Sequence, residues 1–89
     1  MVYITEVHMS GGSNHEHIAE VRWHDPGSGE KGQCSRSAMV EWILNKGGDA
    51  RVKDHRGDVQ VKVIRANPPY LRTYADNRPT DNLLSLPRY

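Results

Sequence analysis

The sequence predicts an α+β domain, with a mainly antiparallel sheet of four to six short strands and one amphipathic helix packed on one face. Only one stretch, residues 36–46, has the apolar spacing and the end signals of a helix. On both sides of it, short runs rich in Val, Ile, Thr and Tyr alternate with turns that contain Gly and Pro. With 89 residues, the chain is expected to form a single domain, residues 1–89.

The helix expected at residues 36–46 has a recognisable beginning and end. Ser35 and Ser37 are both candidate N-caps, because a hydroxyl oxygen can accept a hydrogen bond from a free amide of the first turn. Gly47 and Gly48 end the helix, since glycine adopts the left-handed C-cap conformation without steric cost. The apolar side chains form one stripe, widened by Trp42: Met39, Val40, Ile43 and Leu44. So short a helix is not stable alone, and its stripe is expected to pack on a sheet.

Residues 2–24 are predicted to form an antiparallel hairpin. Two strand-like runs flank a loop of Ser, Gly and Asn residues. One face of the second run carries its expected core residues: His17, Ala19, Val21 and Trp23. In the first run, Val2 and Ile4 fall on the opposite face from Val7 and Met9. A β-bulge between the two pairs would bring all four side chains to one face.

After the helix, residues 50–65 are predicted to form a second pair of strands. The clearest strand of the chain alternates valines with other residues: Val59, Val61 and Val63 against Gln60, Lys62 and Ile64. A Pro-rich C-terminal segment follows at residues 66–89, where the first two prolines break the strand. Within it we expect a last edge strand at residues 70–74, a turn at Asn77-Arg78-Pro79 and one helical turn near its end.

Charge and cysteine content exclude several classes of protein. The net charge of +1 gives no overall field that would attract nucleic acid or a membrane. The charges are uneven, since residues 1–49 carry four basic and seven acidic side chains, whereas residues 50–89 carry eight and four. The single cysteine, Cys34, excludes an internal disulfide and a Cys-rich zinc site. With no run near the ~18 apolar residues of a membrane span and no signal peptide, a cytoplasmic protein is expected.

Several segments together resemble a known family. They are VYITEVH, GGSNHEHIAEVRW, SRSAMVEWI, GGDARV, PPYLRTYAD and TDNLLSLP. These segments are similar to a family of short bacterial proteins known only as a domain of unknown function, DUF3892. The similarity covers nearly the whole chain and is most distinctive in the closing YLRTYAD and TDNLLSLP. The resemblance implies a small α+β domain without an assigned activity, and it carries no catalytic residues over.

Histidines are the candidate metal ligands. His15 and His17 are two residues apart, so on a strand they would share a face and could chelate a metal. His8 would lie near them across the hairpin. Because this set lies at a solvent edge beside a loop, solvated histidines are the simpler interpretation. The sequence therefore predicts neither a metal nor a cofactor.

Three further motifs give weaker signals. Residues 27–32 match G-x-G-x-x-G, but the helix begins too late, and 89 residues leave no room for a dinucleotide-binding fold. Cys34 precedes the helix N-terminus, where a thiol pKa can fall, but no base is placed beside it. Arg56-Gly57-Asp58 spells an adhesion tripeptide, which is interpreted as a turn. The sequence shows no carboxylate pair, catalytic triad or set of metal ligands, so the chain is predicted not to be an enzyme. An enzyme or metal protein that uses the histidines is the weakest hypothesis.

The pattern most typical of a functional surface is Tyr70, Arg72 and Tyr74. On an extended segment the three share one face, and Arg65 and Arg78 add positive charge nearby. Tyr and Arg are enriched at protein interfaces, rings beside a guanidinium can also stack on bases, and tyrosines can instead pack on the sheet. The sequence therefore predicts a small binding module for a protein partner, as a monomer or weak homodimer. The alternative is a nucleic-acid-binding accessory protein that uses the basic C-terminal half.

Overall fold

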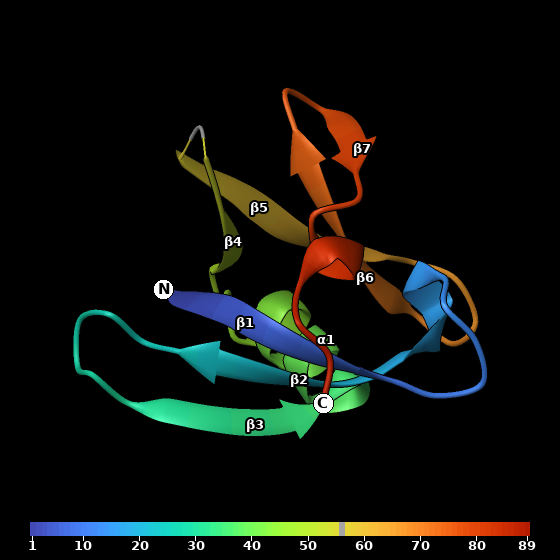
Figure 1. Cartoon of the computed structure of the whole chain (residues 1–89), viewed down its shortest axis with the longest axis horizontal. Helices are drawn as coiled ribbons and strands as arrows, with labels where there is room; N and C mark the ends of the chain where they lie inside the picture. The colour runs from blue at the N-terminus through green and yellow to red at the C-terminus, as the bar shows by residue number, and fades with distance from the viewer. Residues whose placement is uncertain (56) are drawn as a thin grey trace.

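A computed structural model of the chain describes residues 1–55 and 57–89, so Arg56 of the Arg56-Gly57-Asp58 tripeptide lies outside the described residues. Seven strands form one sheet in the order β3-β2-β1-β4-β5-β6-β7 (Figure 1). Their bounds are β1 (Val2–Met9), β2 (Ile18–His24), β3 (Lys31–Ser35), β4 (Ala50–Asp54), β5 (Gly57–Ile64), β6 (Tyr70–Ala75) and β7 (Arg78–Thr80). All neighbours are antiparallel except β1 and β4, which are parallel. The predicted α+β class with a mainly antiparallel sheet is confirmed.

The predicted number of four to six strands is wrong, because the segment that forms β7 was interpreted as a turn. Asp76 and Asn77 both have positive φ, 52° and 64°, and two such residues in a row make a hairpin turn that matches the twist of its strands. The chain therefore reverses after β6, and β7 pairs with the second half of that strand. Pro79 is tolerated in β7 because an edge strand does not need every amide.

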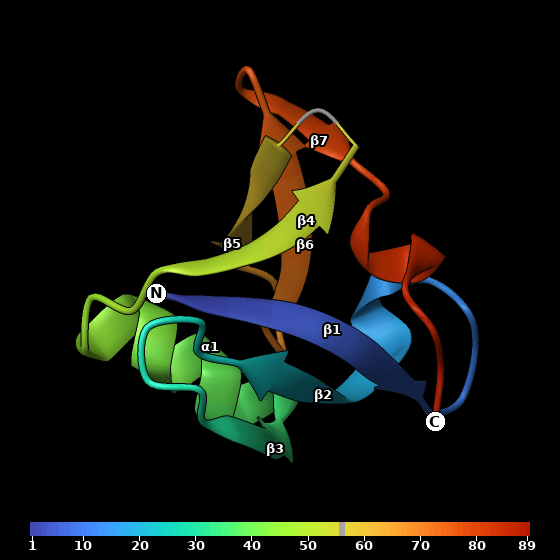
Figure 2. The same cartoon turned by 60° about the vertical axis from the view of Figure 1, so that its left-hand side comes forward.

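One helix, α1 (Arg36–Asn45), connects β3 to β4. These two strands run in the same direction and are separated by β2 and β1, so the connection has to cross a face of the sheet (Figure 2). Ser35 is the N-cap, and its hydroxyl oxygen accepts a hydrogen bond from the amide of Ala38 at 3.1 Å. At the other end, Gly47 adopts the left-handed conformation with φ of 64°. The expected helix boundaries are thereby confirmed to within one residue.

The apolar stripe of α1 is narrower than predicted. Met39 and Val40 are buried, and Trp42 and Ile43 are half-buried against the core. Leu44, the last member of the expected stripe, is 40% exposed. This part of the prediction is wrong because the short helix presents only one narrow side to the sheet, and Leu44 lies beyond it.

β1 contains the bulge that the sequence requires. Ile4 pairs with Trp23 and Glu6 pairs with Arg22, so Thr5 is an extra residue without a partner of its own. As a result the apolar residues on either side of the bulge face the same way, and Val2, Ile4 and Val7 are all buried. A second irregularity lies at the far end of this strand pair.

The second strand differs from its prediction. Residues His15–His17 form a one-turn 3-10 helix, η1, and β2 begins only at Ile18. Ile18 is buried, whereas His17 and Ala19, which were expected on the core face, are half-buried. The expected alternation of buried and exposed residues fails at this end of β2. Glu20 pairs with His8 and Ile18 pairs with Met9, so Ala19 has no partner in β1. The expected core position of Val21 is confirmed, since its side chain is fully buried.

The C-terminal segment fills the place where β4 separates from β1. The two strands pair only at Val2 with Ala50 and Tyr3 with Arg51. Farther along β1, the amide of Val7 donates to the carbonyl of Pro87 at 3.0 Å, so the chain end takes over as the neighbour. A 3-10 turn, η2 (Leu83–Ser85), lies just before this contact, and Figure 1 shows it in red between β1 and β6. No helix in the described part of the chain is long and apolar enough to cross a membrane.

Leu83 is fully buried in η2, so its truncation tests whether the C-terminal segment completes the core. We expect Leu83→Ala to lower the free energy of unfolding by about 2–5 kcal/mol through lost transfer energy and the cavity left behind. Leu44→Ala removes the same atoms from an exposed site and should change the free energy of unfolding by no more than about 0.5 kcal/mol. Urea denaturation of both variants measures the difference, and equal losses would contradict the position of η2.

Candidate functional site

The predicted row of Tyr70, Arg72 and Tyr74 lies on the outer face of β6. Its members alternate with Leu71 and Thr73, which are fully buried on the opposite face. All three side chains in the row are half-buried, as is usual for residues that cover the outside of a sheet. The expectation that they share a face is therefore met.

Basic side chains surround this row. Lys62 of β5 lies opposite Arg72, and its Nζ is 5.5 Å from the ring centroid of Tyr74, within the range of a cation–π contact. Arg65 and Arg78 are both exposed. Among the described residues, none of Lys62, Arg65 and Arg78 forms an ion pair. We call the six side chains the Tyr/Arg face: Tyr70, Arg72, Tyr74, Lys62, Arg65 and Arg78.

Arg72 differs from Lys62, Arg65 and Arg78 because it forms an ion pair and hydrogen bonds with described residues. Its Nη2 donates to Oδ1 of Asp81 at 3.1 Å, and its Nε donates to the carbonyl of Thr80 at 3.4 Å. Asp81 and Thr80 lie where the chain leaves β7 towards η2. Arg72 therefore ties the sheet to the C-terminal segment as well as facing outward, and its side chain remains 31% exposed.

His15 and His17 do not share a strand face, because both lie in η1. His15 is 7% exposed, and its Nε2 has no hydrogen-bond partner but lies 3.8 Å from Oδ1 of Asp81. His17 turns back on its own loop, where its Nδ1 accepts a hydrogen bond from the amide of Asn14 at 3.2 Å. His8 contacts Tyr89 instead, with 5.5 Å between the ring centroids. Within residues 1–55 and 57–89, no three side chains of His, Cys, Asp or Glu are grouped to hold a metal ion.

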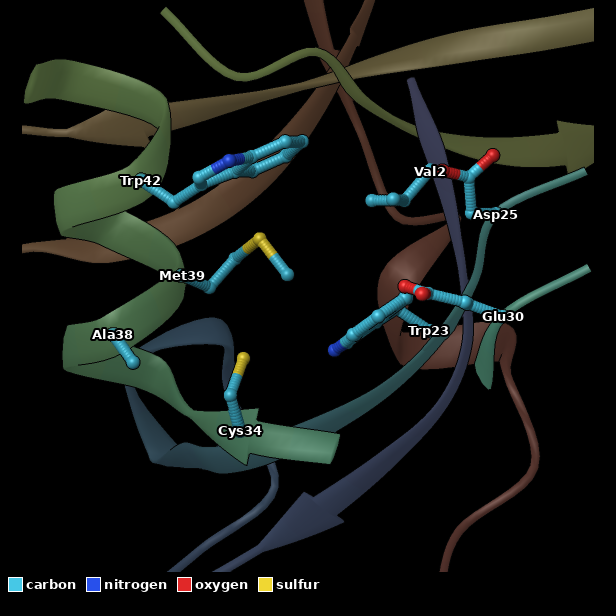
Figure 3. Close-up of a pocket in the computed structure, with 8 residues that line it drawn as sticks. All are labelled: Val2, Trp23, Asp25, Glu30, Cys34, Ala38, Met39 and Trp42. Atoms are coloured by element: carbon cyan, nitrogen blue, oxygen red, sulfur yellow. The ribbon is translucent and has the colours of Figure 1, made fainter. Parts of the chain in front are cut away.

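A second candidate site, which the sequence reasoning missed, is a cavity of about 350 Å³ beside α1. It lies between that helix and the turn that connects β2 to β3, and Figure 3 shows the side chains around it. Its walls combine two indoles, two sulfur atoms, two carboxylates and two small aliphatic groups: Trp23, Trp42, Cys34, Met39, Asp25, Glu30, Val2 and Ala38. None of the described residues that line it is basic.

Both indoles of the cavity rest on glycines. A Cβ atom added to Gly32 would lie 2.6 Å from the ring of Trp23, and one added to Gly48 would lie 2.2 Å from the ring of Trp42. Real Cβ contacts are not so short, so each tryptophan occupies space that only glycine leaves open. The glycines therefore fix where the two rings stand.

The carboxylates stand at the mouth of the same cavity, on the hairpin turn. Oδ1 of Asp25 accepts hydrogen bonds from the amides of Gly27 at 2.8 Å and Ser28 at 3.3 Å. The bond from Gly27 is the main cause that lowers the pKa of the Asp25 carboxyl, with smaller contributions from Ser28 and the chain's α-amino group. The G-x-G-x-x-G match at residues 27–32 is therefore part of a β-hairpin and not a strand–helix turn, as the pattern of a nucleotide site would need.

Cys34 lies in the cavity wall, and the pKa of its thiol is raised and not lowered. Burial raises the pKa of the thiol, and the negative charge of Glu20 raises it further. The position next to the helix N-terminus therefore does not lower the pKa of this thiol. Cys34 contributes a neutral sulfur atom to the wall.

The sequence contained a signal for this cavity. With no Phe in the chain, its two tryptophans stand out, one before the Asp25-Pro26-Gly27 turn and one before the Gly47-Gly48 helix stop. The sequence predicts both in the core, where large aromatic residues usually lie. Their partial exposure and the glycines beneath them appear only once α1 and the β2–β3 hairpin are placed next to each other.

The sheet, the helix and these two surfaces define a small α+β protein with an exposed aromatic and basic face and a separate aromatic cavity. The chain belongs to the family described as "Protein of unknown function (DUF3892)", which it matches over residues 3–87. The resemblance found in the sequence is thereby confirmed. No curated protein and no solved structure matches the chain.

The buried His15 should make stability depend on pH. Burial, and then the charge of Arg72, lower its pKa from 6.5, against opposing effects of Asp81 and Glu16. The folded protein binds the proton of His15 more weakly than the unfolded chain does. The contribution of neutral His15 to stability is therefore fully present above about pH 6.5, and it is lost as pH falls through that value towards the folded pKa. Melting midpoints between about pH 5 and 7.5 should fall on acidification, and His15→Gln should flatten the slope. His24→Gln is the control for loss of an imidazole elsewhere in the chain. If the melting midpoint of the His15→Gln variant depends on pH as steeply as that of the wild type, His15 is not the cause.

Adding a methyl group beneath an indole tests the glycine supports. Gly48→Ala should displace Trp42, change the tryptophan fluorescence and lower the free energy of unfolding by about 1–3 kcal/mol, as overpacking does. Gly27→Ala is the matched control, because its nearest neighbour would be a carboxylate oxygen at 3.3 Å on a side chain that can move. If both variants retain the wild-type fluorescence and stability, Trp42 does not rest on Gly48.

Proposed function

We propose that the chain is a small non-enzymatic binding module whose Tyr/Arg face binds a protein partner that presents acidic side chains. The observation that carries the proposal is the row of Tyr70, Arg72 and Tyr74 on the outside of β6, with three cations around it that form no ion pair with a described residue. Residues 50–89, which include the whole face, carry eight basic and four acidic side chains. An acidic partner surface complements this charge.

The face suits protein recognition for two physical reasons. Tyrosine rings provide large contact areas but lose little conformational freedom on binding, and with arginine they dominate the energetics of many interfaces. Arg72 is already held by Asp81 and Thr80, so ordering its long side chain costs less when a partner binds.

Nucleic acid is the second candidate partner. Lys62 stands over the ring of Tyr74, and such alternation of cations and rings also suits phosphates and stacked bases. Salt separates the candidates: binding to nucleic acid weakens steeply with salt through counterion release. A protein contact anchored by tyrosine rings weakens less, because buried apolar area is not screened.

Affinity capture from the organism's own lysate, with and without nuclease, tests the proposal when it is done with paired variants. The double variant Lys62→Glu with Arg78→Glu reverses two exposed charges of the face and should lose the captured protein while keeping its melting midpoint. Lys46→Glu reverses an exposed charge at the end of α1, and this control variant should still capture the protein. Arg72 is left unchanged, since its loss would also free Asp81.

Each result has a defined meaning. Capture that survives nuclease but fails in the double variant supports a protein partner. Capture that nuclease abolishes supports the nucleic-acid alternative. Equal capture by the wild type, the double variant and the Lys46 control excludes the Tyr/Arg face as the binding surface.

A further inference from the structure

We infer that the cavity between α1 and the β2–β3 turn binds a small organic cation, an ammonium group that carries alkyl substituents. This site is separate from the Tyr/Arg face and does not depend on the function proposed for that face. The argument combines three properties of the cavity: its walls, its charge and its rigidity.

The walls are aromatic and polarisable. Trp42 reaches into the space from α1, and Trp23 approaches it from β2, so that two indoles border one volume (Figure 3). The electron-rich face of an indole attracts a cation, and tryptophan does so best among the aromatic residues. Met39 and Cys34 add sulfur atoms, which pack well against methyl groups.

The charge of the cavity favours a cation. Asp25 and Glu30 are the two carboxylates among the described residues that line it, and neither forms an ion pair with any described residue. Both stand at the mouth, where a bound cation would keep partial contact with water. An anion would be repelled there, and a neutral apolar ligand would gain nothing from the two carboxylates.

The cavity is rigid where it has to be. Gly32 and Gly48 fix the positions of Trp23 and Trp42, and backbone amides hold one oxygen of Asp25, leaving its other oxygen to a ligand. Such preorganisation lowers the cost of binding. A volume of about 350 Å³ suits a small ligand, since pockets of about 300–1,000 Å³ are usual for small molecules.

Choline is the first probe, compared with its uncharged carbon isostere, in which a tert-butyl group replaces the trimethylammonium group. Titrations followed by tryptophan fluorescence and by the two indole N–H signals in NMR report on the cavity directly. We expect choline to shift both indole signals and to bind at least about tenfold more tightly than the isostere, the gain from one cation–π contact. Equal binding of the two compounds, or binding of neither, would overturn the inference.

Charge variants test the mouth without disturbing the fold. Asp25→Asn keeps the oxygen that caps the turn, and Glu30→Gln changes an exposed side chain without a hydrogen-bond partner among the described residues. Each should weaken choline binding about two- to fivefold, the effect of one partly solvated charge. Glu41→Gln, on the exposed side of α1, should leave it unchanged. If Glu41→Gln weakened choline binding as much as the other two variants do, the weakening would come from a general loss of negative charge and not from the mouth of the cavity.

The same chemistry has two sources, a free alkylated amine and a methylated lysine side chain of a peptide. A short peptide that carries one trimethyllysine, compared with its unmethylated form, distinguishes them. Tighter binding of the methylated peptide than of choline assigns the site to a side chain, and weaker binding assigns it to a free small molecule. A preference for the unmethylated peptide contradicts the aromatic recognition on which the inference rests.

Discussion

The sheet has to present all of its large apolar side chains on one face, and β1 is where this constraint is hardest to meet. Its apolar residues follow an alternation that changes phase between Ile4 and Val7, and only the extra residue Thr5 restores a common face. Since β1 lies between β2 and β4, an error of phase there would turn the apolar side chains of an interior strand outward.

A second group of contacts joins three distant parts of the chain. Arg72 of β6, Asp81 after β7 and His15 of η1 meet at one point, where the arginine is hydrogen-bonded and the histidine is buried beside the carboxylate. This point fastens the loop of the first hairpin to the end of the sheet. Arg72 therefore contributes to the fold, because its ion pair with Asp81 ties β6 to the C-terminal segment.

Local patterns predicted most of the fold because local physics decides it. Ser35 caps α1 through its own hydroxyl, Gly47 ends the helix, and the valines of β5 alternate as a half-buried strand must. The bulge at Thr5 was also foreseeable, since no regular strand could satisfy both pairs of apolar residues. The formation of β7 was not foreseeable, because it depends on consecutive positive φ values in Asp76 and Asn77, which tolerate this conformation without requiring it.

The candidate sites divide in the same way. The row of Tyr70, Arg72 and Tyr74 follows from strand alternation, so the sequence could place it on one face. The aromatic cavity could not be foreseen, because Trp23 and Trp42 are neighbours only through the crossing of α1 over the sheet. The two histidines were misplaced because a single 3-10 turn, which has no strong sequence signal, replaced the beginning of a strand.

Because the sheet does not close on itself, it ends in two edge strands, β3 and β7. An open edge is a template on which a second chain can add a strand, and long apolar edges lead to fibrils. Here β7 has only three residues and contains Pro79, while β3 is short and begins with Lys31. Proline removes a donor, and lysine repels its own copy, so both ends of the sheet resist growth. Pro79 in β7 and Lys31 in β3 thus guard the protein against aggregation.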